Sequence, residues 1–283
     1  MSTNRVHYFH ADACAFGGYF ESPIEHTIAP QAPMSLPPSG GYGSARVENF
    51  RVEGLVSYES ASTQVSGRLS RKEDGGWVTH SSAVVEGLNI LGLITADRLS
   101  AHISTEHPLD GNNPKVNFLG TSFENLRIAG HPVELTLDLD ICDQGKPNAY
   151  PVPDIPCVSN EGFLKKVAEQ YRQTCDAKNI PERITDRTIP EWVRQRYTWD
   201  KEKSGKNGSV LCSVVTRANG MFPGRPFGNA LEVPGLGRLF LGELLVDCKS
   251  YQLTMVRMEL GCPATGQSSA ATAKANGGTY PPS

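Results

Sequence analysis

The sequence predicts a mainly β protein, either a repeat-containing β-sandwich or a short β-solenoid, with one helical insertion. Three observations indicate this fold class. The 283 residues include 28 Gly and 20 Pro, which indicates many turns and therefore many short strands. A strand-like segment recurs along the chain at one fixed spacing. Between about residues 159 and 206 the pattern changes to one that is typical of helices.

The repeat consists of three octets that align without gaps, Val47–Gly54, Val85–Gly92 and Phe123–Gly130, with steps of 38 residues between them. In each octet the first, fourth and sixth positions are apolar, the second is Glu, the third is Asn or Gly, and the eighth is Gly. Asn or Gly at the third position permits a bulge or a positive φ, and the closing Gly indicates a turn. One unit of this size cannot bury its apolar face alone, so the units must stack or pair.

A solenoid would bring the three repeat glutamates into one column, where like charges are unfavourable unless they are exposed and screened. Arginines three residues later in the first and third octets can compensate two of these glutamates. The residues concerned are Glu48, Glu86 and Glu124, with Arg51 and Arg127.

The helical insertion is expected to contain two helices. In the first, over 161–178, the apolar residues fall at helical spacing, and Ser159 or Asn160 is a suitable N-cap. A second short helix is expected to begin at Pro190, a residue that suits the first helical position. The apolar stripe of the first helix comprises Phe163, Leu164, Val167, Ala168 and Tyr171.

We therefore expect four segments. Residues 1–158 form a β-rich repeat region, 159–206 form the helical insertion, and 207–263 supply C-terminal strands that complete the same β domain. Residues 264–283 are small and polar, a composition typical of a flexible tail.

The bulk properties limit the range of partners and locations. A formal net charge of −3 provides no global basic field, so a nucleic-acid partner is not expected. No apolar run approaches the roughly 18 residues that a membrane span requires. The first residues lack the apolar segment of a secretory signal, so we expect a cytoplasmic protein or export by a non-classical route.

Three groups of residues are candidates for chemistry, and each has a structural alternative. His10, Asp12 and Cys14 share one face if they lie on a strand and could bind a transition metal; the alternative is a first strand with incidental polar residues. The aromatic residues Trp192, Tyr197 and Trp199 could form a platform for a glycan or a partner, or could anchor the insertion on the β body. A disulfide between Cys142 and Cys157 would staple a loop rich in Gly and Pro; the alternative is that all seven cysteines are reduced.

Several stretches resemble bacterial proteins of the choice-of-anchor P type. The resemblance covers residues 14–140 and the C-terminal strands, and it rests on aliphatic, Gly and Thr positions. The segments that carry it best are Val85–Ala96, Thr121–Val133 and Leu253–Gly261. It implies a β-rich module that is secreted or at the cell surface, and it implies no catalytic residues.

The sequence contains no nucleophile elbow, zinc-protease, P-loop or dinucleotide motif, so neither catalytic residues nor a cofactor are expected. The first hypothesis is a structural or interaction protein that binds a protein partner or self-associates through an exposed sheet edge. The alternatives are a carbohydrate-acting or carbohydrate-binding protein on a β scaffold, and a metal-binding module.

Overall fold

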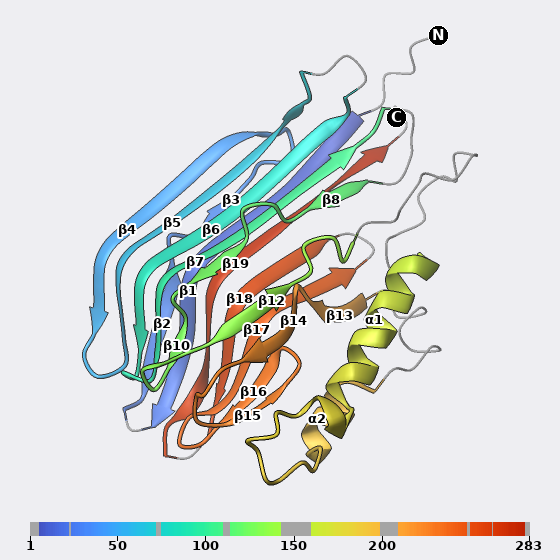
Figure 1. Cartoon of the computed structure of the whole chain (residues 1–283). Coiled ribbons are helices and arrows are strands. Elements are labelled where there is room, and N and C mark those ends of the chain that lie inside the picture. Colours follow the sequence, from blue (N-terminus) through green and yellow to red (C-terminus); the bar gives the residue numbers. More distant parts are fainter. Residues whose placement is uncertain are drawn as a thin grey trace.

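A computed structural model shows a mainly β chain with antiparallel sheets and two α-helices (Figure 1). It describes residues 6–22, 24–71, 75–109, 114–142, 160–198, 209–247, 250–261 and 263–280. Within these residues no helix is both long and apolar enough to cross a membrane.

The larger sheet, sheet A, has nine strands, with the main order β15-β16-β17-β18-β19-β1-β2. In addition, β13 pairs with β17, and β3 pairs with β1. The strands are β1 (Val6–Ser22), β2 (His26–Gln31), β3 (Met34–Ser35), β13 (Ser209–Ser213), β15 (Arg225–Phe227), β16 (Ala230–Val233), β17 (Gly237–Asp247), β18 (Tyr251–Leu260) and β19 (Thr265–Tyr280).

Sheet B has eight strands in the main order β11-β10-β7-β6-β5-β4, with β8 and β9 also paired to β7. A separate two-stranded sheet joins β12 to β14. The strands of sheet B are β4 (Gly41–Val52), β5 (Val56–Leu69), β6 (Trp77–Ile90), β7 (Ile94–His107), β8 (Lys115–Asn117), β9 (Ser122–Glu124), β10 (Arg127–Ile128) and β11 (His131–Pro132); the small sheet has β12 (Glu134–Leu137) and β14 (Val215–Asn219).

The core lies between the two large sheets. Strands β1, β18 and β19 of sheet A contact β5, β6 and β7 of sheet B. Many of the buried residues in these strands are alanines, whose small side chains let two sheets approach closely. Examples are Ala11 and Ala273 in sheet A and Ala61, Ala83 and Ala101 in sheet B, all at most 1% exposed.

The expected flexible tail is wrong: residues 265–280 form β19, a 16-residue strand that lies between β18 and β1. The small residues that resembled a linker are the ones that fit a strand in the middle of a packed sheet. Ala270, Ala271, Ala273 and Ala275 are at most 1% exposed. A central strand needs ladder partners on both sides more than it needs large side chains, and β1 and β18 provide them.

The three octets have the same local conformation. The third residue of each has a positive φ (Asn49 at 52°, Gly87 at 65° and Asn125 at 53°). The eighth residue also has a positive φ, at Gly54 (73°), Gly92 (67°) and Gly130 (79°). Asn49 and Gly87 lie within β4 and β6, Asn125 lies between β9 and β10, and the eighth positions fall in the hairpin turns that follow. Asn and Gly are the residues that reach this backbone region at least cost.

Consecutive strands of sheet B run antiparallel and are joined by hairpins, which differs from the coiled path of a β-solenoid. The repeat glutamates therefore do not stack directly. Across the sheet they alternate with residues of the intervening strands, in the row Glu48, Ser60, Glu86, Arg98 and Glu124.

The compensation expected from Arg51 and Arg127 is wrong. Arg51 pairs with Glu53 at 2.9 Å, and Arg127 donates to the backbone carbonyl of Gly130. Glu86 is instead balanced by its cross-strand neighbours: Ser60 Oγ donates to it at 2.7 Å, and Arg98 Nη1 lies 3.4 Å away. Cross-strand neighbours are closer to the carboxylate than a residue beyond the bend of its own strand.

The two α-helices are α1 (Glu161–Thr174) and α2 (Glu191–Arg196), and a 3₁₀ turn (Ala177–Asn179) follows α1. Asn160 caps α1, with its side chain accepting from Phe163 N at 3.0 Å, and the helix buries the predicted stripe residues Phe163, Val167 and Tyr171. Pro190 is the N-cap of α2, so this helix begins at Glu191, one residue later than expected. Both helices lie beside β13 and β17 of sheet A (Figure 1).

Candidate functional site

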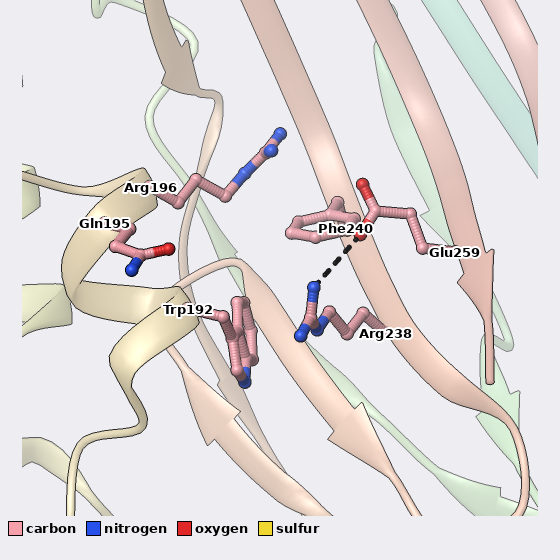
Figure 2. Close-up of a pocket in the computed structure, with 6 residues that line it drawn as sticks. All are labelled: Trp192, Gln195, Arg196, Arg238, Phe240 and Glu259. Carbon is pink, nitrogen blue, oxygen red and sulfur yellow. Dashed lines mark ion pairs between the residues drawn. The ribbon is translucent and has the colours of Figure 1, made fainter. Parts of the chain in front are cut away.

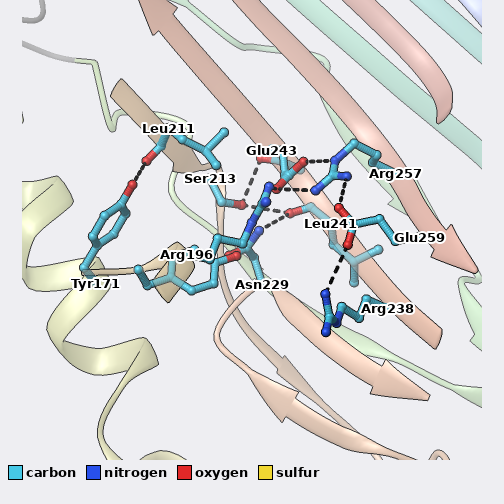
Figure 3. Close-up of polar contacts among 12 residues, drawn as sticks. Tyr171, Arg196, Leu211, Ser213, Asn229, Arg238, Leu241, Glu243, Arg257 and Glu259 are labelled. Carbon is cyan, nitrogen blue, oxygen red and sulfur yellow. Dashed lines mark hydrogen bonds and ion pairs between the residues drawn. The ribbon is translucent and has the colours of Figure 1, made fainter. Parts of the chain in front are cut away.

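The candidate site lies where α2 crosses β17 and β18 (Figure 3). Leu239 and Leu241 of β17 point to one face of sheet A and Phe240 to the other, and all three are at most 1% exposed. A strand buries both faces only when a second layer covers it. Here that layer is the helical segment, which contributes buried apolar residues such as Phe163 and Val193 to the core and adds a charged contact at α2.

A buried carboxylate, Glu243 of β17, holds this contact together. Its side chain is 7% exposed and is paired with Arg196 of α2 and with Arg257 Nε of β18, the latter at 2.5 Å. Arg257 also pairs with Glu259 at 2.6 Å, and Glu259 lies 3.5 Å from Arg238 of β17. Burying a carboxylate without a counter-charge would be strongly unfavourable, so the two arginines are what allow Glu243 to be there.

The protonation states follow from this network. Burial by itself would raise the pKa of Glu259, but the hydrogen bond from Arg257 and the charges of Arg257, Arg196 and Arg238 outweigh it, so its pKa lies below the ordinary value. Burial opposes the charge of Arg257, yet its bonds to Glu243 and Glu259 raise its pKa. The network therefore favours the charged forms of Glu259 and Arg257.

Aromatic rings lie against the same guanidinium groups. The centroid of the Phe240 ring is 4.2 Å from the Arg196 guanidinium carbon and 4.1 Å from that of Arg257. Arg238 lies 4.6 Å above the ring of Trp192 on α2. Cation–π contacts of this length are worth about 0.5–2 kcal/mol each, depending on how far they are desolvated.

An open pocket of ≈ 320 Å³ lies between α2 and β17–β18 (Figure 2). Its lining comprises Trp192, Gln195, Arg196, Arg238, Phe240 and Glu259. Among these six, two arginines face one glutamate, so the lining carries an excess of one positive charge. Arg238 is the more exposed arginine, with 42% of its side chain accessible against 24% for Arg196.

A second set of polar contacts fixes the helices below the pocket (Figure 3). Tyr197, directly after α2, donates to Asn229 at 3.1 Å, and Asn229 donates in turn to the Leu241 carbonyl at 3.2 Å. Tyr171 of α1 donates to the Leu211 carbonyl of β13. The first two hydrogen bonds are buried and the third is partly buried, and together they tie α1 and α2 to the sheet.

The three aromatic residues predicted to form either a binding platform or an anchor for the insertion have different environments. Trp192 lines the pocket, and its ring packs edge-on against Phe227 (5.9 Å) and Phe240 (6.1 Å). Tyr197 is 4% exposed and acts as an anchor. Trp199 lies outside the described residues.

The three predicted metal ligands do lie on β1, but they do not form a ligand set. His10 Nε2 is 3.2 Å from Asp12, which also accepts from Ser35 at 2.7 Å. Cys14 Sγ donates to backbone carbonyls of Phe16 and Gln31. Over the part of the chain that the structure describes, no three His, Cys, Asp or Glu side chains are grouped so as to hold a metal ion.

The predicted disulfide remains a prediction. Cys142 is 3% exposed, and Cys157 lies outside the described residues.

Sequence reasoning missed the charged network on β17 and β18, which comprises Arg238, Glu243, Arg257 and Glu259. A signal was present, because Glu243 and Arg257 each interrupt an otherwise apolar strand. A charge at a buried position implies a partner of opposite charge, although the sequence does not say which one.

These features define a mainly antiparallel β protein in which short helices cover one sheet and form an arginine-lined and aromatic pocket with it. The chain belongs to the family described as Domain of unknown function (DUF8256), whose model matches residues 7–247. Comparison with curated proteins gave no significant match, and neither did comparison with solved structures. The matched residues include Trp192, Arg196, Arg238 and Glu243.

Proposed function

We propose that the protein is a non-catalytic interaction protein. Its body is a β-sandwich built on the 38-residue repeat, and the helical insertion completes the pocket at α2. The pocket binds a carboxylate of a protein partner. The resemblance to choice-of-anchor P proteins supports a contact at the cell surface or outside the cell.

The main support for this proposal is that most hydrogen-bond donors of Arg238 have no partner among the described residues. A guanidinium group has five N–H donors in a planar fork that matches a carboxylate. Among the described residues Arg238 makes one ion pair, at 3.5 Å to Glu259, and its stacking on Trp192 fixes the plane of the fork. It therefore keeps unused donors at the edge of an open pocket with excess positive charge.

Hydrolysis of a glycan fits this site less well. A glycosidase needs one carboxylic acid with a raised pKa to protonate the leaving group. Glu259 has a lowered pKa, and Glu243 is held by two arginines. Simple sugar binding would need a free aromatic face, whereas Arg238 covers a face of Trp192.

The proposal can be tested by NMR, through the indole N–H signal of Trp192. The ¹⁵N-labelled chain is titrated with N-acetyl-glutamate amide, which presents one side-chain carboxylate, and separately with the corresponding glutamine derivative. A single paired carboxylate is expected to bind with a Kd on the order of 1 mM. We expect the Trp192 signal to move with the glutamate derivative and to stay in place with the glutamine derivative.

Two variants make the result specific. Trp192→Phe identifies the signal, and Arg238→Gln is expected to abolish the shift while leaving the Trp77 signal, which is remote from the pocket, unchanged. Equal responses to the glutamate and glutamine derivatives would contradict carboxylate recognition. A stronger response to inorganic phosphate than to the glutamate derivative would contradict the assignment to a carboxylate.

A further inference from the structure

Strand β4 (Gly41–Val52) is an open edge of sheet B. Within the described residues it forms a ladder with β5 on one side only, and it is the outermost strand of the sheet in Figure 1. Edge strands present a row of unpaired backbone N–H and C=O groups and are natural templates for another strand. Proteins often protect such edges with Pro or with charged side chains, Lys above all; β4 contains no Pro or Lys, and its charged residues are Arg46, Glu48 and Arg51.

The usable part of this edge is the segment before the bend. The positive φ of Asn49 turns the strand, so a straight partner can follow it only over residues 41–48. The face of this segment that points away from the core carries Tyr42, Ser44, Arg46 and Glu48. Tyr42 is 67% exposed, and the side chain of Arg46 is 62% exposed. Arg46 pairs with Glu48 of its own strand at 2.9 Å, and both Tyr42 and Arg46 keep an accessible face for a partner.

We propose that a second copy of this chain pairs with β4 in antiparallel register over residues 41–47, with the two-fold axis at Ser44. In this register Ser44 lies opposite Ser44 of the partner subunit, and Tyr42 lies opposite Arg46 of the partner subunit. The two-fold axis creates the tyrosine–arginine contact twice, which is the self-complementarity that a symmetric dimer requires. Each contact is a cation–π pair between directly opposed side chains.

Other registers fit this segment less well. Two residues that lie directly opposite each other in a sheet have their side chains on the same face, and neighbouring residues of one strand point to opposite faces. A two-fold axis between two residues would place neighbours opposite each other, so the axis has to pass through a residue. An axis at Arg46 would oppose two guanidinium groups. An axis at Ala45 would place Tyr42 opposite Glu48 of the partner subunit, where the negative face of the ring meets a carboxylate. An axis at Val47 would require pairing across the bend at Asn49.

A single cysteine at the axis tests both the dimer and its register. In a Ser44→Cys variant the two opposed Cα atoms would be about 4.5–5.5 Å apart, within the range of a disulfide. In a Glu48→Cys variant the two cysteines would be offset by eight positions, or about 27 Å. We expect Ser44→Cys, and not Glu48→Cys, to form a covalent dimer on non-reducing gels after mild oxidation, with the wild-type chain showing the background from its native cysteines.

Light scattering provides the second readout. The wild-type chain is expected to approach twice its 30.7 kDa mass as its concentration rises, and Arg46→Glu is expected to stay monomeric with an unchanged circular dichroism spectrum. Two results would overturn the proposal: a mass of 30.7 kDa at every concentration together with no Ser44→Cys cross-link, or equal cross-linking of both cysteine variants.

Discussion

At the scale of single residues, the hairpin turn at Ala129 and Gly130 contains a residue that does not suit its backbone conformation, because Ala129 has a positive φ. Both residues have a positive φ, of 49° and 79°. Turns with two positive φ values favour Asn-Gly, and a residue with a Cβ, such as Ala, costs about 1–2 kcal/mol in this region. Asn tolerates it better, and the side chain of Ala129 is exposed, so a larger residue meets no neighbour.

We therefore expect Ala129→Asn to stabilise the protein by up to about 1 kcal/mol, measured as the free energy of unfolding in urea. Ala129→Val is the matched control and should destabilise, because a β-branched side chain is least tolerant of positive φ. Equal stabilities for the two variants would show that the turn does not keep this conformation in solution.

At the scale of elements, the attachment of α2 to sheet A depends on one buried charge. Glu243 is buried and pairs with both Arg196 and Arg257. Removing one partner from a buried ion cluster leaves uncompensated charge and costs about 3–5 kcal/mol. The pair on the surface of α1, Glu169 with Arg172, is exposed and screened by solvent, so it should contribute much less to stability.

Accordingly, Glu243→Gln is expected to lower the free energy of unfolding by about 3 kcal/mol and to make the 160–198 segment more sensitive to limited proteolysis. Glu169→Gln removes an exposed carboxylate from the same insertion and should leave the free energy of unfolding nearly unchanged. If the two variants lose the same stability, the buried cluster does not hold α2 to the sheet.

At the scale of the whole molecule, the packing of the two sheets responds to acid through His7. This residue is 7% exposed on β1, and its ring stacks on Trp77 of sheet B at 4.9 Å, with His107 5.0 Å away. Burial, and secondarily the charge of His107, lower the pKa of His7 from 6.5 to about 4. The neutral form of His7 therefore belongs to the folded state.

The sign of the pH effect follows from proton uptake. The unfolded chain binds a proton at His7 below about pH 6.5 and the folded chain only near pH 4, so stability is complete above pH 6.5 and is lost as the pH falls towards 4. A difference of this size corresponds to about 3 kcal/mol. His7→Phe keeps a ring against Trp77 and removes the titration, so its stability should fall less between pH 7 and 4. Identical pH profiles for the two proteins would contradict a buried, neutral His7.

The sequence by itself determined the features that depend on a few consecutive residues. It indicated a mainly β chain, the turns at Gly54, Gly92 and Gly130, and the special backbone at the third octet position. It also predicted a helix that begins after Asn160. Positive φ, hairpin turns and helix capping are local properties, because the residues that cause them are neighbours in the chain.

Only the tertiary structure decided which distant segments meet. Residues 265–280 have a linker's composition, and they became β19 because β1 and β18 offer unpaired ladder groups on both sides. Arg196, Arg238 and Glu243 are unremarkable one at a time, and they form a site because α2 crosses β17 there. Burial and counter-charge belong to pairs of residues far apart in the chain, so no local pattern can specify them.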